Sequence, residues 1–196
     1  IRDGIAKPQD VQHFAGNIYT EAQRLIALVG DIIRLSQLDE GSVGSEKTDL
    51  RLDGMAASVV SRLQDAAAQH DVTLRTDLKP CRVHGIAQIV DELIYNLCDN
   101  AIKYNRDGGR VDITVAHDAD GSSVTVADTG IGIAPEHQAR VFERFYRVDK
   151  SHSKASGGTG LGLSIVKHAM QLHHGRIELE STPGTGTTIR AIFPKA

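Results

Sequence analysis

The stretch DELIYNLCDNAIKY, residues 91–104, decides how the rest of the sequence is interpreted. It contains no Gly or Pro, and Glu92, Asn96 and Asn100 recur every four residues, so on a helix they share one face, with Lys103 close by. Carboxylate and amide oxygens in such a row suit a hard cation, and a nearby ammonium suits a phosphate. A polar helical face is more often simply solvated, so this stretch predicts a binding site only together with the glycine motifs that follow it.

The composition of the 196 residues excludes several classes of protein. A hydrophobic content of 40% and a charged content of 24% are typical of a globular protein with one ordinary domain and a smaller appendage. The absence of Trp, a net charge of -3 and a pI near 6.3 argue against binding to nucleic acid. There is no apolar run of about 18 residues, so we expect no membrane-spanning segment in this chain.

The two cysteines indicate the redox compartment of the chain, and its first residue indicates whether the sequence is part of a longer protein. Cys81 and Cys98 are too few for a disulfide framework, which predicts buried thiols in a reducing compartment. The sequence starts at Ile1 without an initiator Met or a signal-peptide pattern, and we expect it to be part of a longer protein.

Residues 7–39 predict one long helix, which begins near Pro8 and ends before the Gly- and Ser-rich residues 41–45. Seven of eight positions spaced alternately by three and four residues are apolar: Val11, Phe14, Ile18, Glu21, Leu25, Leu28, Ile32 and Leu35. Such a helix needs partners in a bundle. It is either a core helix of the domain that follows or, as the break at 41–45 favours, part of a separate helical hairpin or dimerisation module.

The remaining sequence alternates strand and helix patterns. Strands are predicted at 48–52, 72–76, 81–84, 110–116, 122–127, 175–180 and 187–193, and helices at 53–70, 91–104, 136–145 and 161–172. Antiparallel pairs mixed with helices predict an α+β fold, arranged as a two-layer α/β sandwich.

Two glycine motifs and the segment between them are candidates for ligand binding. DTGIGI, residues 128–133, leaves a strand with Asp128 at its end, where the carboxylate can accept a hydrogen bond from an amine. GGTGLGLS, residues 157–164, runs into a helix, whose free amides form a cradle for phosphate. VFERFYRVDKS, residues 141–151, has aromatics that suit the anchor of a mobile flap, with Arg147 and Lys150 reaching toward an anion.

Each of these motifs also has an ordinary structural interpretation. The first is then a tight loop, the second a capped helix start and the third a surface loop. The glycine-rich stretch is not a Walker A loop, because no Lys-Ser/Thr pair follows the glycines, and it does not follow a strand as a dinucleotide-binding fingerprint would.

Taken in order, the four stretches resemble the N, G1, F and G2 boxes of bacterial sensor histidine kinases, and GTGTT, residues 184–188, resembles their G3 box. The resemblance covers residues 45–196 as the catalytic ATP-binding domain. Residues 1–41 resemble the end of the dimerisation and histidine-phosphotransfer hairpin, mainly its second helix, as in phosphate-regulon-type sensors. The resemblance implies the Bergerat fold shared with gyrase and MutL, in which helices back a mixed sheet and ATP lies between the helices and the sheet.

By position, the resemblance implies that Asp128 accepts a hydrogen bond from the adenine amino group, with Gly132, Thr188 and Tyr104 at that pocket. Asn100 would coordinate the Mg²⁺ that bridges the phosphates, assisted by Asn96. Lys103 would contact phosphate, and Arg147 would steady the γ-phosphoryl group. Residues 146–159 would form the ATP lid, and the cofactor-binding set is completed by Gly130, Ile133, Gly158, Thr159, Gly160, Leu161 and Gly162.

The chemistry of Asn96 favours transfer to a protein over hydrolysis. Gyrase-type ATPases place a water-activating Glu at the matching position, and an amide cannot take a proton from water. Glu92, one turn earlier, matches a different position, and a structural contact is the favoured interpretation of this residue. The catalytic set implied by the resemblance is therefore Asn96, Asn100, Lys103 and Arg147.

None of the nine histidines has the His-Glu-Leu-Arg/Lys-Thr/Asn-Pro-like context of the family's phosphoacceptor. We expect the acceptor to precede Ile1 in the parent protein, so this chain alone should bind ATP without phosphorylating itself. In the lid, His152 stands where many relatives carry Arg.

The resemblance further implies a cytoplasmic portion of a membrane-anchored sensor, which dimerises through the hairpin and relays phosphate to the receiver domain of a response regulator. The alternatives are a hydrolytic ATPase of the same superfamily and a degenerate nucleotide-binding module.

Overall fold

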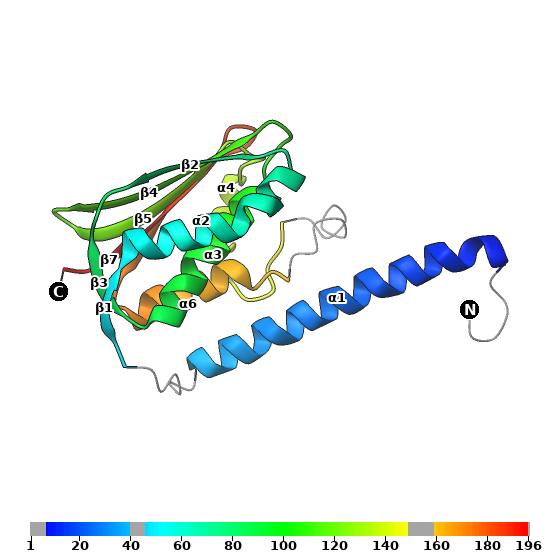
Figure 1. Cartoon of the computed structure of the whole chain (residues 1–196), viewed down its shortest axis with the longest axis horizontal. Coiled ribbons are helices and arrows are strands. Elements are labelled where there is room, and N and C mark those ends of the chain that lie inside the picture. Colours follow the sequence, from blue (N-terminus) through cyan, green and yellow to red (C-terminus); the bar gives the residue numbers. More distant parts are fainter. Residues whose placement is uncertain (1–6, 40–45, 149–158, 196) are drawn as a thin grey trace. The chain divides into compact units, whose positions relative to one another are not determined.

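The structure is a computed structural model that describes residues 7–39, 46–148 and 159–195. The chain divides into two compact units, the larger of which comprises residues 43–148 and 160–196. Helix α1, Pro8–Asp39, belongs to the other unit (Figure 1). No helix in the described ranges is both long and apolar enough to cross a bilayer.

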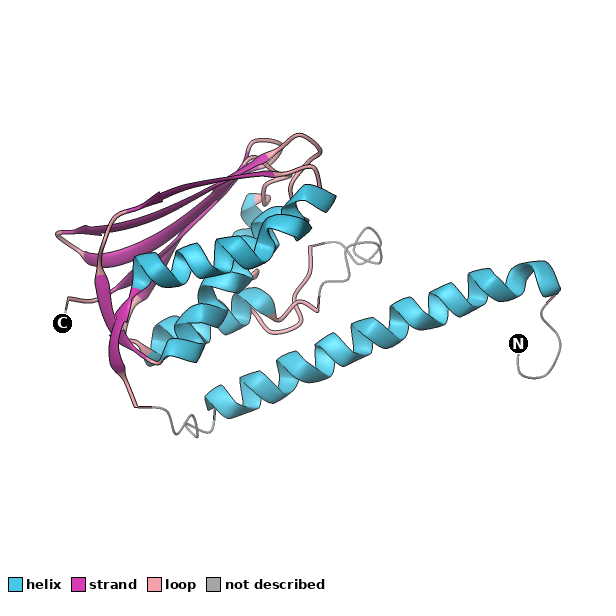
Figure 2. Cartoon of the chain, in the orientation of Figure 1, coloured by secondary structure: helices cyan, strands magenta, loops and turns pink. Residues whose placement is uncertain are grey.

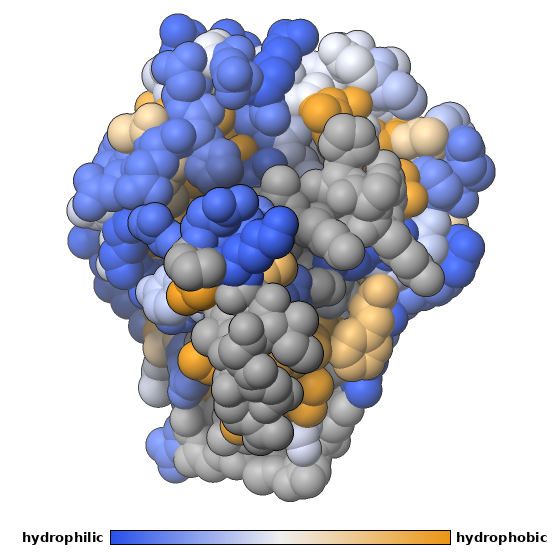
Figure 3. Space-filling view, turned by 90° about the vertical axis from the view of Figure 1, so that its right-hand side faces the viewer, coloured by the Kyte–Doolittle hydropathy of each residue, from blue (hydrophilic) through white to orange (hydrophobic). Residues whose placement is uncertain are grey.

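Helix α1 runs unbroken over 32 residues, which confirms the long helix predicted from the periodicity. Its apolar positions are exposed: Ile18, Leu25 and Val29 leave 64%, 58% and 54% of their surface accessible. The space-filling view shows hydrophobic side chains at the surface among hydrophilic ones (Figure 3). Exposed apolar positions at this spacing are typical of a helix that packs in a bundle.

The larger unit mixes strands and helices along the chain (Figure 2). Its elements are β1 (Thr48–Arg51), α2 (Leu52–Gln69), β2 (Thr73–Leu78), β3 (Arg82–Gly85), α3 (Ala87–Lys103), β4 (Arg110–Asp118), β5 (Gly121–Asp128), α4 (Pro135–Gln138), α6 (Gly162–Leu172), β6 (Arg176–Thr182) and β7 (Gly186–Phe193).

The strands form two sheets. The main sheet has five strands in the order β2-β4-β5-β7-β6, in which β2 pairs parallel with β4 and the other pairs are antiparallel. Strands β1 and β3 form a separate antiparallel pair. This mixed sheet, with helices on one face, confirms the α+β fold predicted from the sequence.

The core lies between the main sheet and helices α2, α3 and α6, which cover one face of it (Figure 1). Alternate residues of β4 point toward the helices, so Val111, Ile113 and Val115 are buried while the intervening side chains are partly exposed. Leu93 and Leu97 of α3 are at most 2% exposed. The polar residues of α3 lie beside this buried stripe, so the packing of the helix holds them in a fixed direction.

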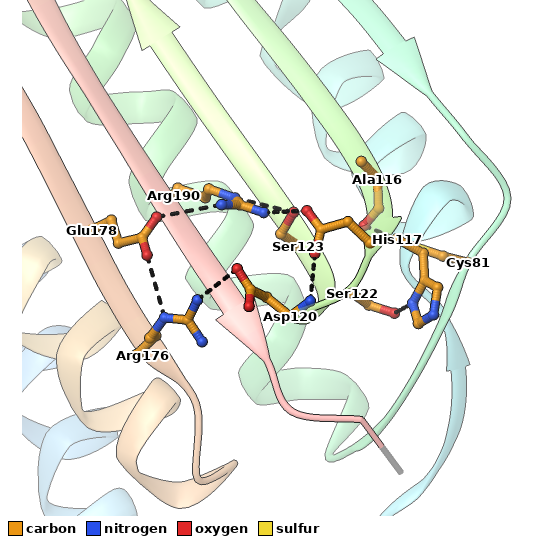
Figure 4. Close-up of polar contacts among 10 residues, drawn as sticks. Cys81, Ala116, His117, Asp120, Ser122, Ser123, Arg176, Glu178 and Arg190 are labelled. Carbon is orange, nitrogen blue, oxygen red and sulfur yellow. Dashed lines mark hydrogen bonds and ion pairs between the residues drawn. The ribbon is translucent and has the colours of Figure 1, made fainter.

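The two cysteines are free and buried, as the sequence predicted. Burial raises the pKa of Cys98 to about 12, so its thiol stays protonated at neutral pH. Burial also raises the pKa of Cys81, whose sulfur donates to the carbonyl oxygen of Ala116 (Figure 4).

Two predicted boundaries are corrected by the structure. Helix α3 begins at Ala87, four residues earlier than the quoted stretch. The helix predicted over 136–145 is wrong beyond Gln138, because α4 ends there and Arg140 and Glu143 donate to carbonyls only three residues back. Phe145 then has a φ of 63°, which an α-helix does not accommodate.

An ionic network ties the β4–β5 turn to the last two strands (Figure 4). Arg190 of β7 pairs with Asp118 and Glu178, and Arg176 of β6 pairs with Asp120 and Glu178. Its members are partly exposed, so each pair contributes little to stability, and the network acts mainly to fix the turn relative to β6 and β7.

We expect Leu93→Ala to lower the free energy of unfolding by about 2–5 kcal/mol, because it leaves a cavity between α3 and the sheet. Urea unfolding followed by tyrosine fluorescence measures this change. The control is Gln88→Ala, an exposed position of the same helix, which should change stability by no more than about 0.5 kcal/mol. Equal effects of the two substitutions would contradict the placement of Leu93 in the core.

Candidate functional site

The polar face of α3 meets the glycine-rich start of α6. A Cβ built on Gly162 would lie 2.8 Å from Oδ1 of Asn96 and 3.3 Å from Nδ2 of Asn100. Asn96 also donates from Nδ2 to the carbonyl oxygen of Glu92 at 2.8 Å, which turns its Oδ1 toward Gly162. The structure therefore brings together residues of two separate motifs, Asn96 and Asn100 of 91–104 and Gly162 of 157–164.

The first turn of α6 presents backbone N–H donors that the helix itself does not use. The first four N–H groups of any α-helix have no partner within the helix, and Leu161 at the N-cap makes no side-chain capping bond. Leu161 itself is fully buried, and Ser164 turns its hydroxyl back to the Leu161 carbonyl oxygen at 2.7 Å. Donors of this kind, beside a residue without a side chain, form a site for an anion.

Lys103 lies on the same helix as the two amides. Its ammonium pairs with Asp99 one turn earlier, at 2.7 Å between Nζ and Oδ2. The side chain is 34% exposed, so it can leave this partner for a stronger anion nearby.

At the end of β5, the carboxylate of Asp128 is oriented by two backbone donors. Its Oδ1 accepts from the N–H groups of Gly130 at 2.8 Å and Thr187 at 3.2 Å. Among the described residues, no group donates to its Oδ2. Burial raises the pKa of this carboxyl, an effect that the two N–H donors partly oppose.

Close backbone contacts enclose Asp128. A Cβ on Gly130 would lie 2.3 Å from the carbonyl oxygen of Tyr104, which also accepts from the N–H of Ile131. Gly186 has a φ of 135°, and a Cβ there would lie 1.9 Å from the Asp128 carbonyl oxygen. The chain passes close enough for these contacts only because both positions are glycine.

The loop after β5 contacts the end of β6, next to the β6–β7 turn. Gly132 has a φ of 69°, and a Cβ there would lie 2.1 Å from the carbonyl oxygen of Thr182. Ile133 donates from its N–H to the hydroxyl of Ser181 at 2.8 Å. The predicted G1 and G3 motifs are thus neighbours in space.

Thr188 is not the threonine that contacts Asp128. The Thr187 N–H donates to the carboxylate, and the Thr187 hydroxyl bonds to Ser181. Side chains alternate along a strand, so Thr188 and Arg190 lie on the opposite face of β7 from Thr187 and Ile189. The contact to Asp128 is made by the backbone N–H of Thr187, and a role for Thr188 at this site stays a prediction.

The F-box segment is anchored at its start. Tyr146 bonds through its hydroxyl to Nδ1 of His137 at 2.7 Å, and the Arg140 guanidinium lies 4.3 Å from its ring centroid. The Phe145 N–H donates to the Gly160 carbonyl oxygen at 3.0 Å, which joins the two ends of the predicted lid. Sequence analysis assigned no role to His137 or Arg140.

The structure places the other predicted residues as follows. Arg147 directly follows Tyr146 and is half-buried. Thr159 directly precedes Gly160 and is also half-buried. Gly158, Lys150 and His152 lie outside the described residues.

In chemical terms the site has two ends joined by α3. Amides, free N–H groups and an ammonium at one end suit phosphates and a hard cation. A carboxylate between glycines at the other end suits an amine-bearing ring. No cluster of three or more His, Cys, Asp and Glu side chains that could hold a metal occurs in the part of the chain that the structure describes.

Comparison with known proteins agrees with this geometry. Residues 85–196 match the family model described as histidine kinase-, DNA gyrase B-, and HSP90-like ATPase. The matched range contains α3, α6, Asp128 and the final hairpin, which together make the site.

Among curated proteins, the chain is similar to the sensor-like histidine kinase SenX3 of Mycobacterium tuberculosis, with 41% identity over 95% of this chain and 46% of the relative. The phosphate regulon sensor protein PhoR of Pseudomonas aeruginosa is 36% identical over 90% of this chain and 40% of its own length. The chain thus spans less than half the length of these relatives. A solved structure of the mycobacterial sensor histidine kinase MprB matches 76% of this chain and 97% of its own, with 26% identity and a TM-score of 0.66.

We expect Asp128→Asn to be at least as stable as the wild type at pH 7. The amide oxygen keeps the bonds from Gly130 and Thr187, and the substitution removes a carboxylate whose ionisation burial disfavours. Because the folded-state pKa is raised above 3.8, stability falls as the pH rises from 3.8 through that pKa, and the loss persists at neutral pH.

The difference in melting temperature between Asp128→Asn and the wild type should therefore shrink as the pH is lowered from 7 toward 4. Differential scanning calorimetry at several pH values measures it. A variant that melts well below the wild type at pH 7 would contradict the assignment.

Proposed function

The chain belongs to the family of histidine kinase-, DNA gyrase B- and HSP90-like ATPases, and from this premise we propose that it is the ATP-binding catalytic portion of a sensor histidine kinase. The observation that carries the proposal is the arrangement of two sites on α3. Asn96 and Asn100 face the start of α6, and the backbone after Tyr104, at the end of the same helix, reaches the loop that holds Asp128.

Asp128 is the adenine-recognising group in this proposal. Its Oδ1 is occupied by two backbone donors, which leaves Oδ2 to accept from an exocyclic amine. Gly130 and Gly132 let the backbone approach the ring, with Ile133 behind them, and Tyr104 lies at the same edge. The backbone N–H of Thr187 completes this end of the site.

The phosphates are held by the N–H groups at the start of α6, around Gly160, Leu161 and Gly162, with Gly158 and Thr159 before them in the sequence. Lys103 exchanges Asp99 for a phosphate oxygen, and Arg147 steadies the terminal phosphoryl group. The amide oxygens of Asn100 and Asn96 fit Mg²⁺, which commonly takes few protein ligands and completes its shell with phosphates and water. When bound, this ion neutralises charge on the phosphates.

Transfer to a protein is favoured over hydrolysis by the chemistry of Asn96. This residue makes its own contacts to Glu92 and Gly162, and an amide has no basic site with which to activate water. The residues of the chain position the phosphoryl group and neutralise its charge, and the nucleophile comes from elsewhere.

In the parent protein, α1 forms the second helix of a hairpin that dimerises and carries the acceptor histidine. The exposed apolar positions of α1 support this role. Since no histidine of this chain has the acceptor context, the γ-phosphoryl group passes to a histidine outside it and then to the aspartate of a response regulator. This activity belongs to the cytosolic side of a membrane-anchored sensor.

Two other functions fit the same family. A hydrolytic ATPase would turn over ATP without an acceptor polypeptide, and a degenerate module would bind nucleotide weakly or not at all. The amides of Asn96 and Asn100 disfavour the first, and the oriented carboxylate of Asp128 disfavours the second.

We expect Asp128→Asn to weaken ATP binding by more than about tenfold, because a hydrogen bond to a charged group is worth about 1.5–3 kcal/mol. Isothermal titration calorimetry measures the affinity. The matched control is Asp107→Asn, an exposed aspartate in the turn before β4, which should bind as the wild type does. Unchanged affinity in Asp128→Asn would remove this residue from the adenine site.

We expect phosphoryl transfer from ATP to a separately added polypeptide that bears the hairpin's first helix and its histidine. Radiolabelled γ-phosphate should appear on the added polypeptide only with Mg²⁺, and Asn100→Ala should reduce the initial rate by at least about tenfold. ATP hydrolysis without transfer would support the ATPase alternative, and absence of binding would support the degenerate module.

A further inference from the structure

His173 is buried at the far end of α6 and bonds to two elements. Its exposed fraction is 4%, and it forms the C-cap of α6. Nδ1 lies 2.7 Å from the carbonyl oxygen of Ala169 in the last turn of α6, and Nε2 accepts from the N–H of Ile86 at 3.0 Å. Ile86 is the N-cap of α3, so one imidazole joins the end of α6 to the beginning of α3.

The two bonds define the protonation state of the ring. A carbonyl can only accept, so Nδ1 carries the hydrogen, and Nε2 must then be the unprotonated nitrogen to accept from Ile86. The ring is therefore neutral in this arrangement. Burial agrees, since it lowers the pKa of His173.

The surroundings of the ring leave it no alternative position. A Cβ on Gly85 would lie 2.7 Å from Nε2, and the Phe193 ring packs edge-on with its centroid 5.6 Å away. The charged and titratable groups that act on it are Lys47, before β1, and the adjacent His174, and both disfavour a positive charge on the ring.

Helices α3 and α6 meet again at the proposed phosphate site, where Gly162 contacts Asn96 and Asn100. At a rise of 1.5 Å per residue, Asn96 lies about 15 Å along α3 from Ile86, and Gly162 about 10 Å along α6 from Ala169. Helices are stiff over such lengths, so a rotation at the His173 end displaces the groups at the other end.

We propose that His173 is a positioning residue that fixes α3 relative to α6, and so keeps the amides of Asn96 and Asn100 against the phosphate-binding start of α6. This inference rests on the proposed function of that site. A ring protonated on both nitrogens cannot accept from Ile86, so acid conditions release the start of α3. The affinity for nucleotide then depends on the protonation of a residue that does not touch it.

Two conservative substitutions of His173 test the two hydrogen bonds of its ring one at a time. The amide of His173→Asn reaches only the Nδ1 position, so it keeps the bond to Ala169 and leaves the Ile86 N–H without its acceptor. The amide of His173→Gln reaches the Nε2 position and retains an acceptor for Ile86 without titrating. His174→Asn is the matched control, because His174 is exposed and its φ of 54° is one that Asn tolerates.

The test is calorimetric titration of the whole chain with Mg-ATP at pH 7.5 and 5.0, at a temperature where circular dichroism shows each variant folded. At pH 7.5, His173→Asn should bind about tenfold more weakly than the wild type, the size expected for an unpaired buried N–H, and His173→Gln should stay within about threefold. Because burial lowers the pKa of His173 below the usual value of about 6.5, protonation of the ring belongs to the acid side of that value, and toward pH 5.0 the wild type should lose more affinity than His173→Gln. Gly85→Ala, which displaces the ring from the other side, should weaken binding as His173→Asn does.

A residue that only stabilised the fold would lower the melting temperature of its variants without changing the affinity of the folded protein or its pH profile. Equal affinities of wild type, His173→Asn and His173→Gln at both pH values would overturn the inference, as would a His173→Gln variant as weak as His173→Asn. In either case the proposed function would stand. A wild type that bound no nucleotide would overturn both.

Discussion

The approach of α6 to α3 at Gly162 is the contact on which the rest of the site depends. A side chain at this position would meet the amides of Asn96 and Asn100, so only glycine allows the first turn of α6 to lie beside them. The direction of these amides is set by the buried side of α3, where Leu93, on the face next to Asn100, and Leu97 are at most 2% exposed. Core packing therefore determines where the two amides point.

The same helix also connects the two ends of the site. Its last turn leads to Tyr104, whose carbonyl oxygen receives the N–H of Ile131 from the loop after Asp128. Glycine again permits the contact, since Gly130 lies against that carbonyl. The separation between Asp128 and the amides of Asn96 and Asn100 is thus fixed by a rigid element, which in the proposed function suits a ligand of one defined length.

Features encoded locally could be predicted from the sequence, and those that depend on distant contacts could not. The periodicity of α3, the alternation of β4 and the glycine turns around Asp128 are properties of short segments, and the structure contains all of them. That the backbone N–H of Thr187 reaches Asp128 depends on the register of β7 against β5, which the sequence does not give.

Two further features escaped the sequence analysis for the same reason. The segment after Gln138 contains residues that suit a helix, but it is shaped by the bond of Tyr146 to His137 and of Phe145 to Gly160. The bond between His173 and Ile86 spans 87 residues, and nothing in the residues next to His173 indicates it. A local sequence pattern indicates a helix or a strand, but which distant residue a side chain contacts is seen only in the folded chain.

The site also carries groups that the folded chain leaves incompletely satisfied. Asp128 is an ionisable group whose burial disfavours its charge, the start of α6 has no side-chain cap, and Lys103 is held only by a partly exposed ion pair. The buried carboxylate lowers the stability of the folded chain, and the other two features add little to it. In the proposed function, each of the three is complementary to one part of a nucleotide. A ligand that satisfies all of them stabilises the folded state in proportion to its affinity and concentration. We therefore expect bound nucleotide to stabilise the larger unit as well as to serve as its ligand.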